Sequence, residues 1–196
     1  RFSETISCVR IDDHRASHDM TAHLIVHGHT RIGYIKGDPN QTASAHRLQG
    51  YRDALAEAGI AFDDKLVRPG YFTYRSGLEA GESLLALADP PTAIFASNDD
   101  MASAVVSVAH RRGLDVPRDL SVVGFDDTSA STMVWPELTT VHQPVASMAD
   151  AAIDILLREI RRATNSARVI VNHVVPHKLV KRASVAARKK SKLVRQ

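Results

Sequence analysis

Three short apolar runs, each ending in a polar turn, constrain the fold of this chain most strongly. The runs are Arg31–Lys36, Ala93–Ser97 and Ser121–Phe125, and the polar residues that follow them include Asp38, Asn98 and Asp126. Strands that alternate with helices of about a dozen residues predict an α/β fold with a doubly wound parallel sheet. Right-handed crossovers bring the carboxyl ends of such strands to one edge of the sheet, where ligands bind in open sheets of this kind. The pattern therefore predicts a polar pocket at that edge.

The composition is that of a soluble globular protein. The 196 residues are 44% hydrophobic and 24% charged, and no apolar run approaches the roughly 18 residues that a membrane helix needs. This length suffices for one domain, or for one lobe and part of another. The single cysteine, Cys8, excludes an internal disulfide and fits a reducing compartment, so we expect a cytoplasmic protein. Because the sequence begins with Arg1 and not with methionine, we interpret it as a fragment, and the lack of a signal peptide has no bearing on localisation.

The charge is distributed unevenly along the chain. Residues 178–196 hold eight Lys or Arg and no Asp or Glu, which leaves 17 basic and 22 acidic residues in the remainder. A basic tail after a mildly acidic body can contact nucleic acid, or it can simply be solvated. We favour the solvated tail and leave the other interpretation open.

Histidines are concentrated early in the chain. His14 and His18, and then His23 and His27, stand four residues apart in a segment predicted to be a helix. That spacing can bind a metal ion from one helix face. Neither pair has the carboxylate or third ligand of an HExxH-like pattern, so we interpret them as surface and packing residues. We expect no metal and no cofactor.

The sequence lacks the common motifs of catalysis and nucleotide binding. No strand is followed by GxGxxG, and neither GxxxxGK[ST] nor a GxSxG elbow occurs. Ser, His and Asp are plentiful, but none stands in a setting that would activate a nucleophile. We therefore expect a binding protein and not an enzyme.

Two features near the predicted pocket have both a functional and a structural explanation. Arg47 stands in the first turn of a helix predicted over 44–58, where a cation opposes the helix dipole at a cost of roughly a few tenths of a kcal/mol. Its guanidinium suits an oxygen-rich ligand, which we favour, or an ion pair with a neighbouring carboxylate. The loop that holds Tyr71, Phe72 and Tyr74 can stack on a sugar or a base, or pack against the protein or a second subunit. For the aromatic loop we favour neither explanation.

Segments spread along the chain resemble the effector-binding core of the lac repressor/galactose repressor (LacI/GalR) family of bacterial transcription regulators. The matching segments include His23–Ile25, Arg31–Ile35, Arg47–Leu55, Ala93–Ala102, Pro117–Asp127, Leu138–Pro144 and Leu179–Ser184. One of them reads Leu-Ser-Val-Val-Gly-Phe-Asp-Asp at 120–127. The resemblance runs from about Ser7 to Ser184, with the segments in the family's order and spacing.

The resemblance implies a periplasmic-binding-protein-like fold, with one complete doubly wound parallel-sheet lobe and a partial second lobe. Residues 1–28 would be a remnant of the N-terminal lobe with a crossover helix, 29–140 the complete C-terminal lobe, 141–184 the return to the N-terminal lobe, and 185–196 a basic tail. The chain would cross between lobes near Gly28–His29 and again near Thr139–Gln143. A helix-turn-helix headpiece and the first elements of the N-terminal lobe would be missing, so parts of the partial lobe would lack packing partners.

The resemblance also implies a ligand site and a mechanism. The ligand-binding residues would be Arg47, Phe72, Asn98, Asp126 and Gln143, with Asp12 and Asp13 as further candidates for the far wall of the pocket. The donors and acceptors of this set suit a hydroxylated ligand, although Asn98 and Asp126 could also cap helices. A small sugar or purine-like effector would favour closed lobes and thereby change operator binding by the headpieces of a homodimer. The alternative is a periplasmic sugar-binding protein that serves a transporter.

Overall fold

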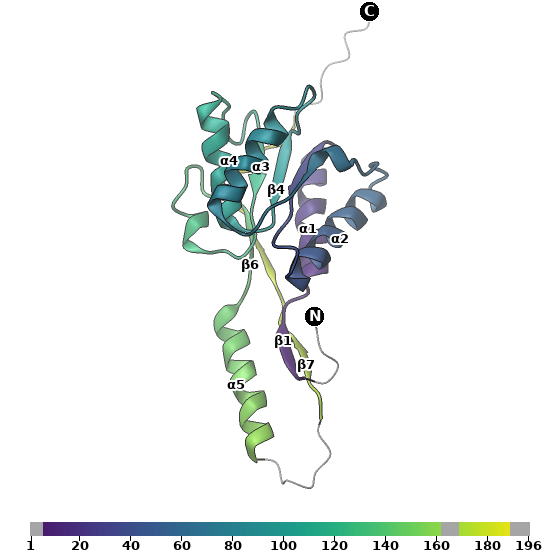
Figure 1. The fold of residues 1–196 in the computed structure, drawn as a ribbon, viewed down its shortest axis with the longest axis vertical. Coiled ribbons are helices and arrows are strands. Elements are labelled where there is room, and N and C mark those ends of the chain that lie inside the picture. Colours follow the sequence, from purple (N-terminus) through teal and green to yellow (C-terminus); the bar gives the residue numbers. More distant parts are fainter. Residues whose placement is uncertain (1–5, 162–168, 189–196) are drawn as a thin grey trace, which may run out of the picture.

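The computed structural model describes residues 6–161 and 169–188, which form a larger and a smaller unit (Figure 1). The helices are α1 (Asp13–Val26), α2 (Thr42–Glu57), α3 (Tyr74–Leu85), α4 (Asp99–Arg111) and α5 (Val145–Arg161). The strands are β1 (Cys8–Arg10), β2 (Ile32–Ile35), β3 (Val67–Arg68), β4 (Ala93–Ala96), β5 (Ser121–Val123), β6 (Thr140–His142), β7 (Asn172–Val174) and β8 (Lys178–Val180). The larger unit holds β2 to β5 with α1 to α4, and the smaller unit holds β1, β7 and α5.

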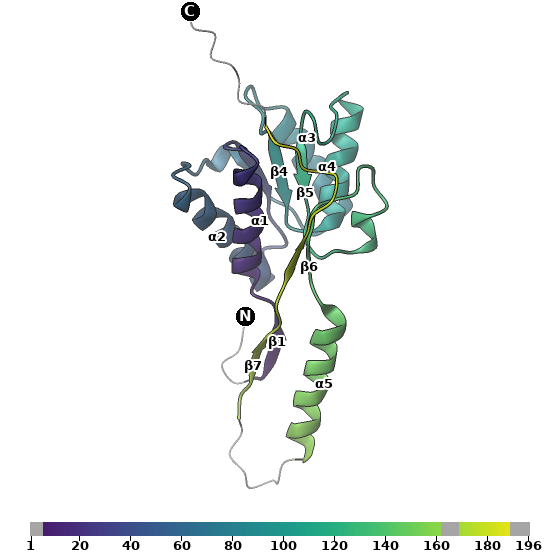
Figure 2. The same ribbon diagram turned by 180° about the vertical axis from the view of Figure 1, so that it is seen from behind.

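The larger unit is built on a four-stranded parallel sheet in the order β3-β2-β4-β5. Helices α1 and α2 cover one face of this sheet, and α3 and α4 cover the other (Figures 1 and 2). Successive side chains of a strand point to opposite faces, so Phe95 of β4 packs with α1 and α2 while its neighbour Ile94 packs with α3 and α4. Strands β2, β4 and β5 are therefore buried along their whole length. The prediction of a doubly wound parallel α/β sheet is confirmed.

The register of the sheet brings the carboxyl ends of β2, β4 and β5 to one edge, which we call the rim. Ile35 lies opposite Ala96, and Phe95 lies opposite Val123. Each strand thus ends at nearly the same level, and the polar turns that follow the strands meet at the rim. This edge faces the crossover strands and the smaller unit (Figure 2).

Helix α1 lies on the sheet of the larger unit, beside α2 (Figure 2). Its residues Met20 and Leu24 are fully buried in the aromatic core on that face of the sheet. The resemblance implies that residues 1–28, which include α1, belong to the N-terminal lobe. The apolar stripe of α1 shows that the helix is buried, but it does not show which sheet buries it. We therefore propose that the larger unit begins near Asp12 and not at His29.

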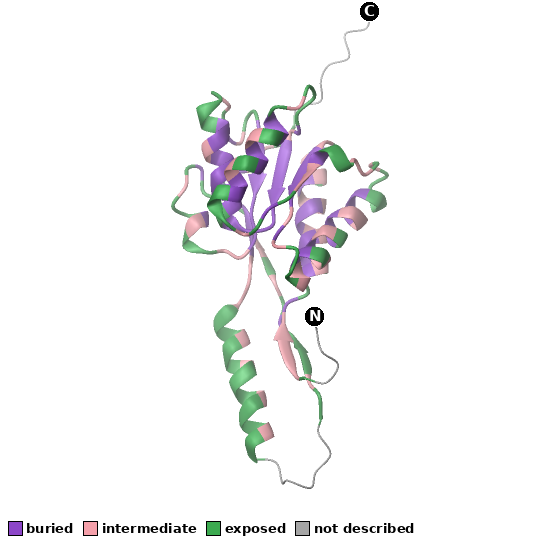
Figure 3. Ribbon diagram, in the orientation of Figure 1, coloured by how far each residue is buried: buried purple, intermediate pink, exposed green. Residues whose placement is uncertain are grey.

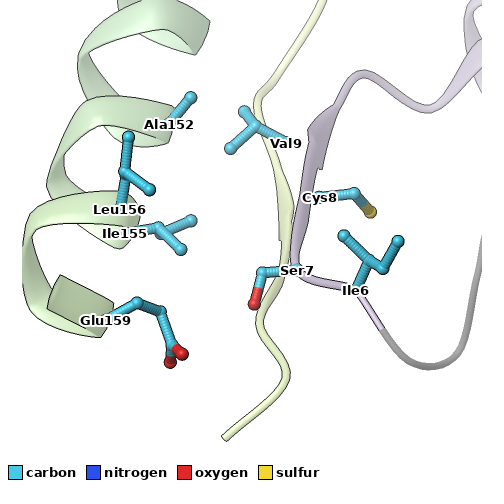
Figure 4. A pocket seen from close by; sticks show the side chains of 8 residues that line it. All are labelled: Ile6, Ser7, Cys8, Val9, Ala152, Ile155, Leu156 and Glu159. Atoms are coloured by element: carbon cyan, nitrogen blue, oxygen red, sulfur yellow. The ribbon is translucent and has the colours of Figure 1, made fainter. Parts of the chain in front are cut away.

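The smaller unit consists of a two-stranded parallel sheet, β1 with β7, and the long helix α5 beside it. No residue of α5 is buried (Figure 3), although the helix carries an apolar face. Figure 4 shows Ala152 and Ile155 pointing toward β1, and Val9 pointing back, around a cavity of about 280 Å³. The expectation that parts of this unit lack packing partners stays a prediction. No helix in the described ranges is both long and apolar enough to cross a membrane.

The chain returns to the larger unit after β8, which pairs with β6 in an antiparallel ladder. Beyond this ladder it runs back along β5 (Figure 2), where the Val122 backbone nitrogen donates to the Ser184 carbonyl oxygen at 3.0 Å. The resemblance implies that residues 141–184 return to the N-terminal lobe. Because the side chain of Ser184 is fully buried against β5, we propose that this residue belongs to the larger unit. Of the predicted basic tail, residues 189–196 lie outside the described part of the chain.

Candidate ligand-binding site

Arg47 lies at the centre of the rim, 5% exposed, and three oxygen groups fix its guanidinium. Its Nε donates to Asp13 Oδ1 at 2.8 Å, its Nη1 donates to the Ser97 carbonyl oxygen at 2.6 Å, and the same Nη1 lies 3.6 Å from Asp126 Oδ1. The guanidinium carbon stands 3.5 Å from the centroid of the Phe125 ring, which adds a cation–π contact. The ion pair considered for Arg47 is thus present. Its Nη2 makes no hydrogen bond to a described residue.

Asn98 caps helix α4 and also holds the aromatic loop. Its Oδ1 accepts from the Met101 backbone nitrogen at 3.0 Å, and its Nδ2 donates to the Phe72 carbonyl oxygen at 3.0 Å. Phe72 needs this support because its φ of 59° lies in the left-handed region, which residues with a Cβ rarely adopt. Capping, one of the two roles considered for Asn98, is confirmed, and the side chain keeps one N–H and one lone pair for a further partner.

Asp126 follows β5 in a strained conformation with its carboxylate at the rim. Its φ is 107° and that of Asp127 is 60°, so two consecutive residues lie in the left-handed region. Gln143 Nε2 donates to Asp126 Oδ1 at 2.5 Å, and the carboxylate side chain remains 26% exposed. Burial raises the pKa of Asp126 above its ordinary value, and the nearby Arg47 guanidinium opposes that rise.

Asp126 does not cap a helix. The next helical turn, Ser129–Ser131, is a short 3-10 turn with Thr128 at its N-cap position and no side-chain capping hydrogen bond. The capping role considered for Asp126 is therefore wrong. A polar residue after a buried strand looks the same in the sequence whether a helix or an extended turn follows it.

The two aspartates at the start of α1 have separate roles. Asp12 is exposed and caps α1, since its Oδ1 accepts from the Arg15 backbone nitrogen at 3.0 Å. Asp13 is buried and holds Arg47. Both are candidates for the far wall of the pocket in the sequence. The structure instead places Asp13 on the same wall as Arg47, and Asp12 caps α1.

The five predicted ligand contacts lie together at the rim. Arg47 approaches Asp126, Asp126 accepts from Gln143, Asn98 donates to the Phe72 backbone, and the Phe72 ring centroid lies 5.7 Å from the Arg47 guanidinium carbon. These contacts join the five residues in one continuous series around a corner of the sheet. The ligand role of each residue stays a prediction.

Sequence reasoning missed three residues that shape this corner, namely Ser97, Phe125 and Asp99. The first two contribute a carbonyl oxygen and an aromatic face to Arg47, and neither has a local sequence signal, because both look like ordinary strand residues. Asp99 stands in the same polar turn as Asn98, so its position after a buried strand could have marked it.

Asp99 is a fully buried carboxylate that ties α4 to the crossover strand β6. Its Oδ1 accepts from Thr140 Oγ1 at 2.6 Å, and its Oδ2 accepts from the Thr128 backbone nitrogen at 2.7 Å. Burial raises the pKa of Asp99 from 3.8 to about 6, and the hydrogen bonds from Thr140 and Thr128 limit the rise. The carboxylate therefore joins three segments that are distant in the sequence.

We expect Asp99→Asn to remove a pH dependence of stability. Because the folded state holds the Asp99 proton more tightly than the unfolded chain, the stability that this group contributes is full below about pH 4 and is lost as the pH rises through about 6. Relative to Asp99→Asn, the wild type should lose on the order of 3 kcal/mol of unfolding free energy between pH 4 and pH 7. Urea unfolding of both proteins across this range measures the difference, and parallel pH profiles would contradict it.

Asp127, the neighbour of Asp126, holds both crossover strands. Its Oδ2 lies 2.9 Å from His142 Nδ1 at the end of β6, and its Oδ1 accepts from Arg182 Nη2, just beyond β8, at 2.6 Å. Burial alone would raise the pKa of Asp127, but the hydrogen bonds from Arg182 and His142 hold it below its ordinary value. The polar corner at Asp126 and the connection between the units at Asp127 thus lie in two adjacent residues.

His14 and His18 pair with carboxylates, whereas the rings of His23 and His27 contact each other. His14 Nε2 lies 2.7 Å from Asp53 Oδ2, and His18 Nε2 lies 2.9 Å from Glu57 Oε2. Each pair links α1 to α2. Within residues 6–161 and 169–188, no group of three His, Cys, Asp or Glu side chains is placed to hold a metal ion.

The fold is that of the periplasmic-binding-protein class, and comparison with known proteins agrees. The profile of the periplasmic binding protein-like domain family matches residues 21–185. Catabolite control protein A of Priestia megaterium is 38% identical over 180 residues, which cover 91% of this chain and 53% of that protein. The HTH-type transcriptional regulator GalR of Escherichia coli K12 is 40% identical over 179 residues, which cover 91% of this chain and 51% of that protein.

A solved structure, the complex of the transcriptional regulator CelR with cellobiose, superimposes with a TM-score of 0.86 at 38% identity, covering 92% of this chain and 54% of that one. The chain belongs to the periplasmic binding protein-like domain family, in the form found in LacI/GalR regulators. It spans about half the length of the curated relatives that it matches.

Proposed function

We propose that this chain is the effector-binding region of a LacI-type transcription regulator. The observation that carries the proposal is the convergence of Arg47, Asn98 and Asp126 at the rim, where open α/β sheets bind ligands. Strained backbone at Phe72 and Asp126 supports it, because such strain is concentrated at functional sites. The rim offers fixed donors and acceptors, so we propose binding without turnover.

The chemistry of the rim favours a hydroxylated ligand of the sugar or purine class. Asp126 Oδ2 can accept from a hydroxyl while Arg47 Nη2 donates to the adjacent oxygen, and charge-assisted bonds of this kind are the stronger ones. The Phe72 ring offers an apolar face for the flat side of the ligand. The cellobiose bound by CelR supports the sugar class.

Ligand binding would be transmitted through Gln143 and Asp127. A hydroxyl that donates to Asp126 Oδ2 would share this carboxylate with Gln143, which donates to Oδ1 and stands at the entrance to α5. Asp127, one residue further, holds the strands that connect the units. A ligand that binds more tightly when the two lobes are closed would therefore increase the population of the closed conformation. This shift would change operator binding by helix-turn-helix headpieces. We place this activity in a cytoplasmic homodimer.

A thermal-shift screen of pentoses, hexoses, sugar phosphates and purines tests the proposal. An effector at about 1,000 times its Kd should raise Tm by roughly 10 °C. Asp126→Asn keeps the shape of the side chain but removes its charge, so it should weaken binding by about tenfold to a hundredfold. The matched control is Asp115→Asn, an exposed carboxylate before β5, which should leave the affinity unchanged.

Two outcomes of the screen would count against the proposal. If Asp126→Asn and Asp115→Asn bind the effector as tightly as the wild type, the ligand binds away from this corner. If no compound of these classes shifts Tm, the ligand class is wrong. A periplasmic transport protein of the same fold would bind sugars equally well, and the regulators among the relatives favour the first function over that one.

A further inference from the structure

A second cavity, of about 350 Å³, opens at the same rim on the side of β2 and β3. It lies between the turn after β2, the first turns of α2 and the loop that precedes α3. Its walls include Gly37, Pro39, Ala45, Leu48 and Tyr71, with the Lys36 side chain among them. Small-molecule sites have volumes of roughly 300–1,000 Å³ and mainly apolar walls, and this cavity has both properties.

The Phe72 ring lies between the Arg47 guanidinium and Gly37, which lines this cavity. On one side the ring rests on Gly37, so closely that a Cβ added to Gly37 would overlap it. On the other side the ring centroid lies 5.7 Å from the Arg47 guanidinium carbon. The polar corner and the apolar cavity are therefore neighbours, joined by the contact between Phe72 and Gly37.

Hydrogen bonds and close packing fix the loop that carries Tyr71 and Phe72. The Tyr71 backbone nitrogen donates to Ser76 Oγ at 3.0 Å, and the Phe72 carbonyl oxygen accepts from Asn98 at 3.0 Å. Gly70 packs so closely on the Lys36 carbonyl oxygen that no side chain would fit there. The Tyr71 ring is nevertheless 56% exposed beside the cavity. An exposed ring on a rigid backbone is a preformed stacking surface.

We propose that the cavity is a second subsite, and that the effector is a glycoside with two rings. This inference rests on the proposed function. The hydroxylated ring lies at Arg47, Asn98 and Asp126, the linking atom passes Phe72, and the second ring packs its flat face between Leu48 and Tyr71. Lys36 donates to an oxygen of that second ring. A disaccharide and a nucleoside share this chemistry, a hydroxylated ring that carries a second ring.

Filling the cavity from α2 tests the inference. Ala45 is exposed and lines the cavity, so Ala45→Phe should occupy the subsite without disturbing the core. Ala56→Phe is the matched control, since it makes the same change at an exposed position near the other end of the helix. The probes are matched sets: glucose with cellobiose, galactose with lactose, and ribose with adenosine and cytidine. Titration calorimetry gives the Kd of each probe.

The wild type and Ala56→Phe should bind one two-ring probe at least about tenfold more tightly than its single ring. Ala45→Phe should lose that preference and keep the affinity for the single ring. Whether the disaccharides or the nucleosides show the preference identifies the second ring.

A preference that survives in Ala45→Phe, or equal binding of both members of every set by the wild type, would overturn the subsite. Binding of a single ring that is lost in Asp126→Asn would still uphold the proposed function in that case. Failure of every probe to bind would overturn the subsite together with the sugar class of the effector.

Discussion

Replacing Arg47 by alanine should lower the free energy of unfolding by about 3–5 kcal/mol, because the change leaves charges buried without a partner. Asp13 loses the cation at 2.8 Å from its Oδ1, and its side chain is only 9% exposed, so water cannot take over that role. Asp126 loses the same cation at 3.6 Å. Urea unfolding with a constant m-value would measure the loss.

Two further variants show whether the loss comes from buried charge. Arg118→Ala removes a guanidinium that is 76% exposed and stands 3.6 Å from its two carboxylate partners, so it should cost less than about 1 kcal/mol. Adding Asp13→Ala to Arg47→Ala removes the stranded carboxylate, and the double variant should lose clearly less than the sum of the two single losses. Strict additivity, or a loss below about 1 kcal/mol for Arg47→Ala, would count against this account.

Gly50→Ala should destabilise the larger unit by about 3 kcal/mol, although alanine is the better helix former. Gly50 lies inside α2 where the helix meets α1, and an added Cβ would overlap the carbonyl oxygen of His14 and stand 2.9 Å from the backbone nitrogen of His18. Backbone atoms cannot rotate away as a side chain can. The two helices would have to separate, and the pairs that link them would lengthen.

Gly81→Ala in α3 is the control for this effect. There the nearest heavy atoms to an added Cβ are Val105 Cγ2 at 3.4 Å and Val108 Cγ2 at 3.5 Å, which is ordinary contact. The better helix propensity of alanine should therefore stabilise this variant by about 1 kcal/mol. The two glycine variants should shift the urea midpoint in opposite directions. Shifts of the same sign and size would show that close packing between α1 and α2 does not set their distance.

Much of the fold follows from local patterns in the sequence. The runs 31–36, 93–97 and 121–125 contain β2, β4 and β5, and the predicted helix over 44–58 is α2 at Thr42–Glu57. Alternating strands and helices then determine that the sheet is parallel and that the polar turns meet at one rim. Arg47, Asn98 and Asp126 were placed at that rim by the same rule.

The remaining features depend on contacts between distant segments, which a local pattern does not encode. Whether α1 packs on the larger or the smaller unit is decided by the aromatic residues that it meets, not by its own stripe. Burial raises the pKa of Asp99, and a hydrogen bond from Thr140, forty-one residues away, limits that rise. Gln143 also depends on a distant segment. It donates a hydrogen bond to Asp126 only because the end of β6 passes beside Asp126.

A crystal structure of the chain with the strongest compound from the screen would test the central claim most directly. We predict the ligand at the rim, with one oxygen within hydrogen-bond distance of Arg47 Nη2, another within that distance of Asp126 Oδ2, and a ring face on Phe72. A ligand seated at the opposite edge of the sheet, for example in the cavity lined by His29 and Arg118, would contradict the claim.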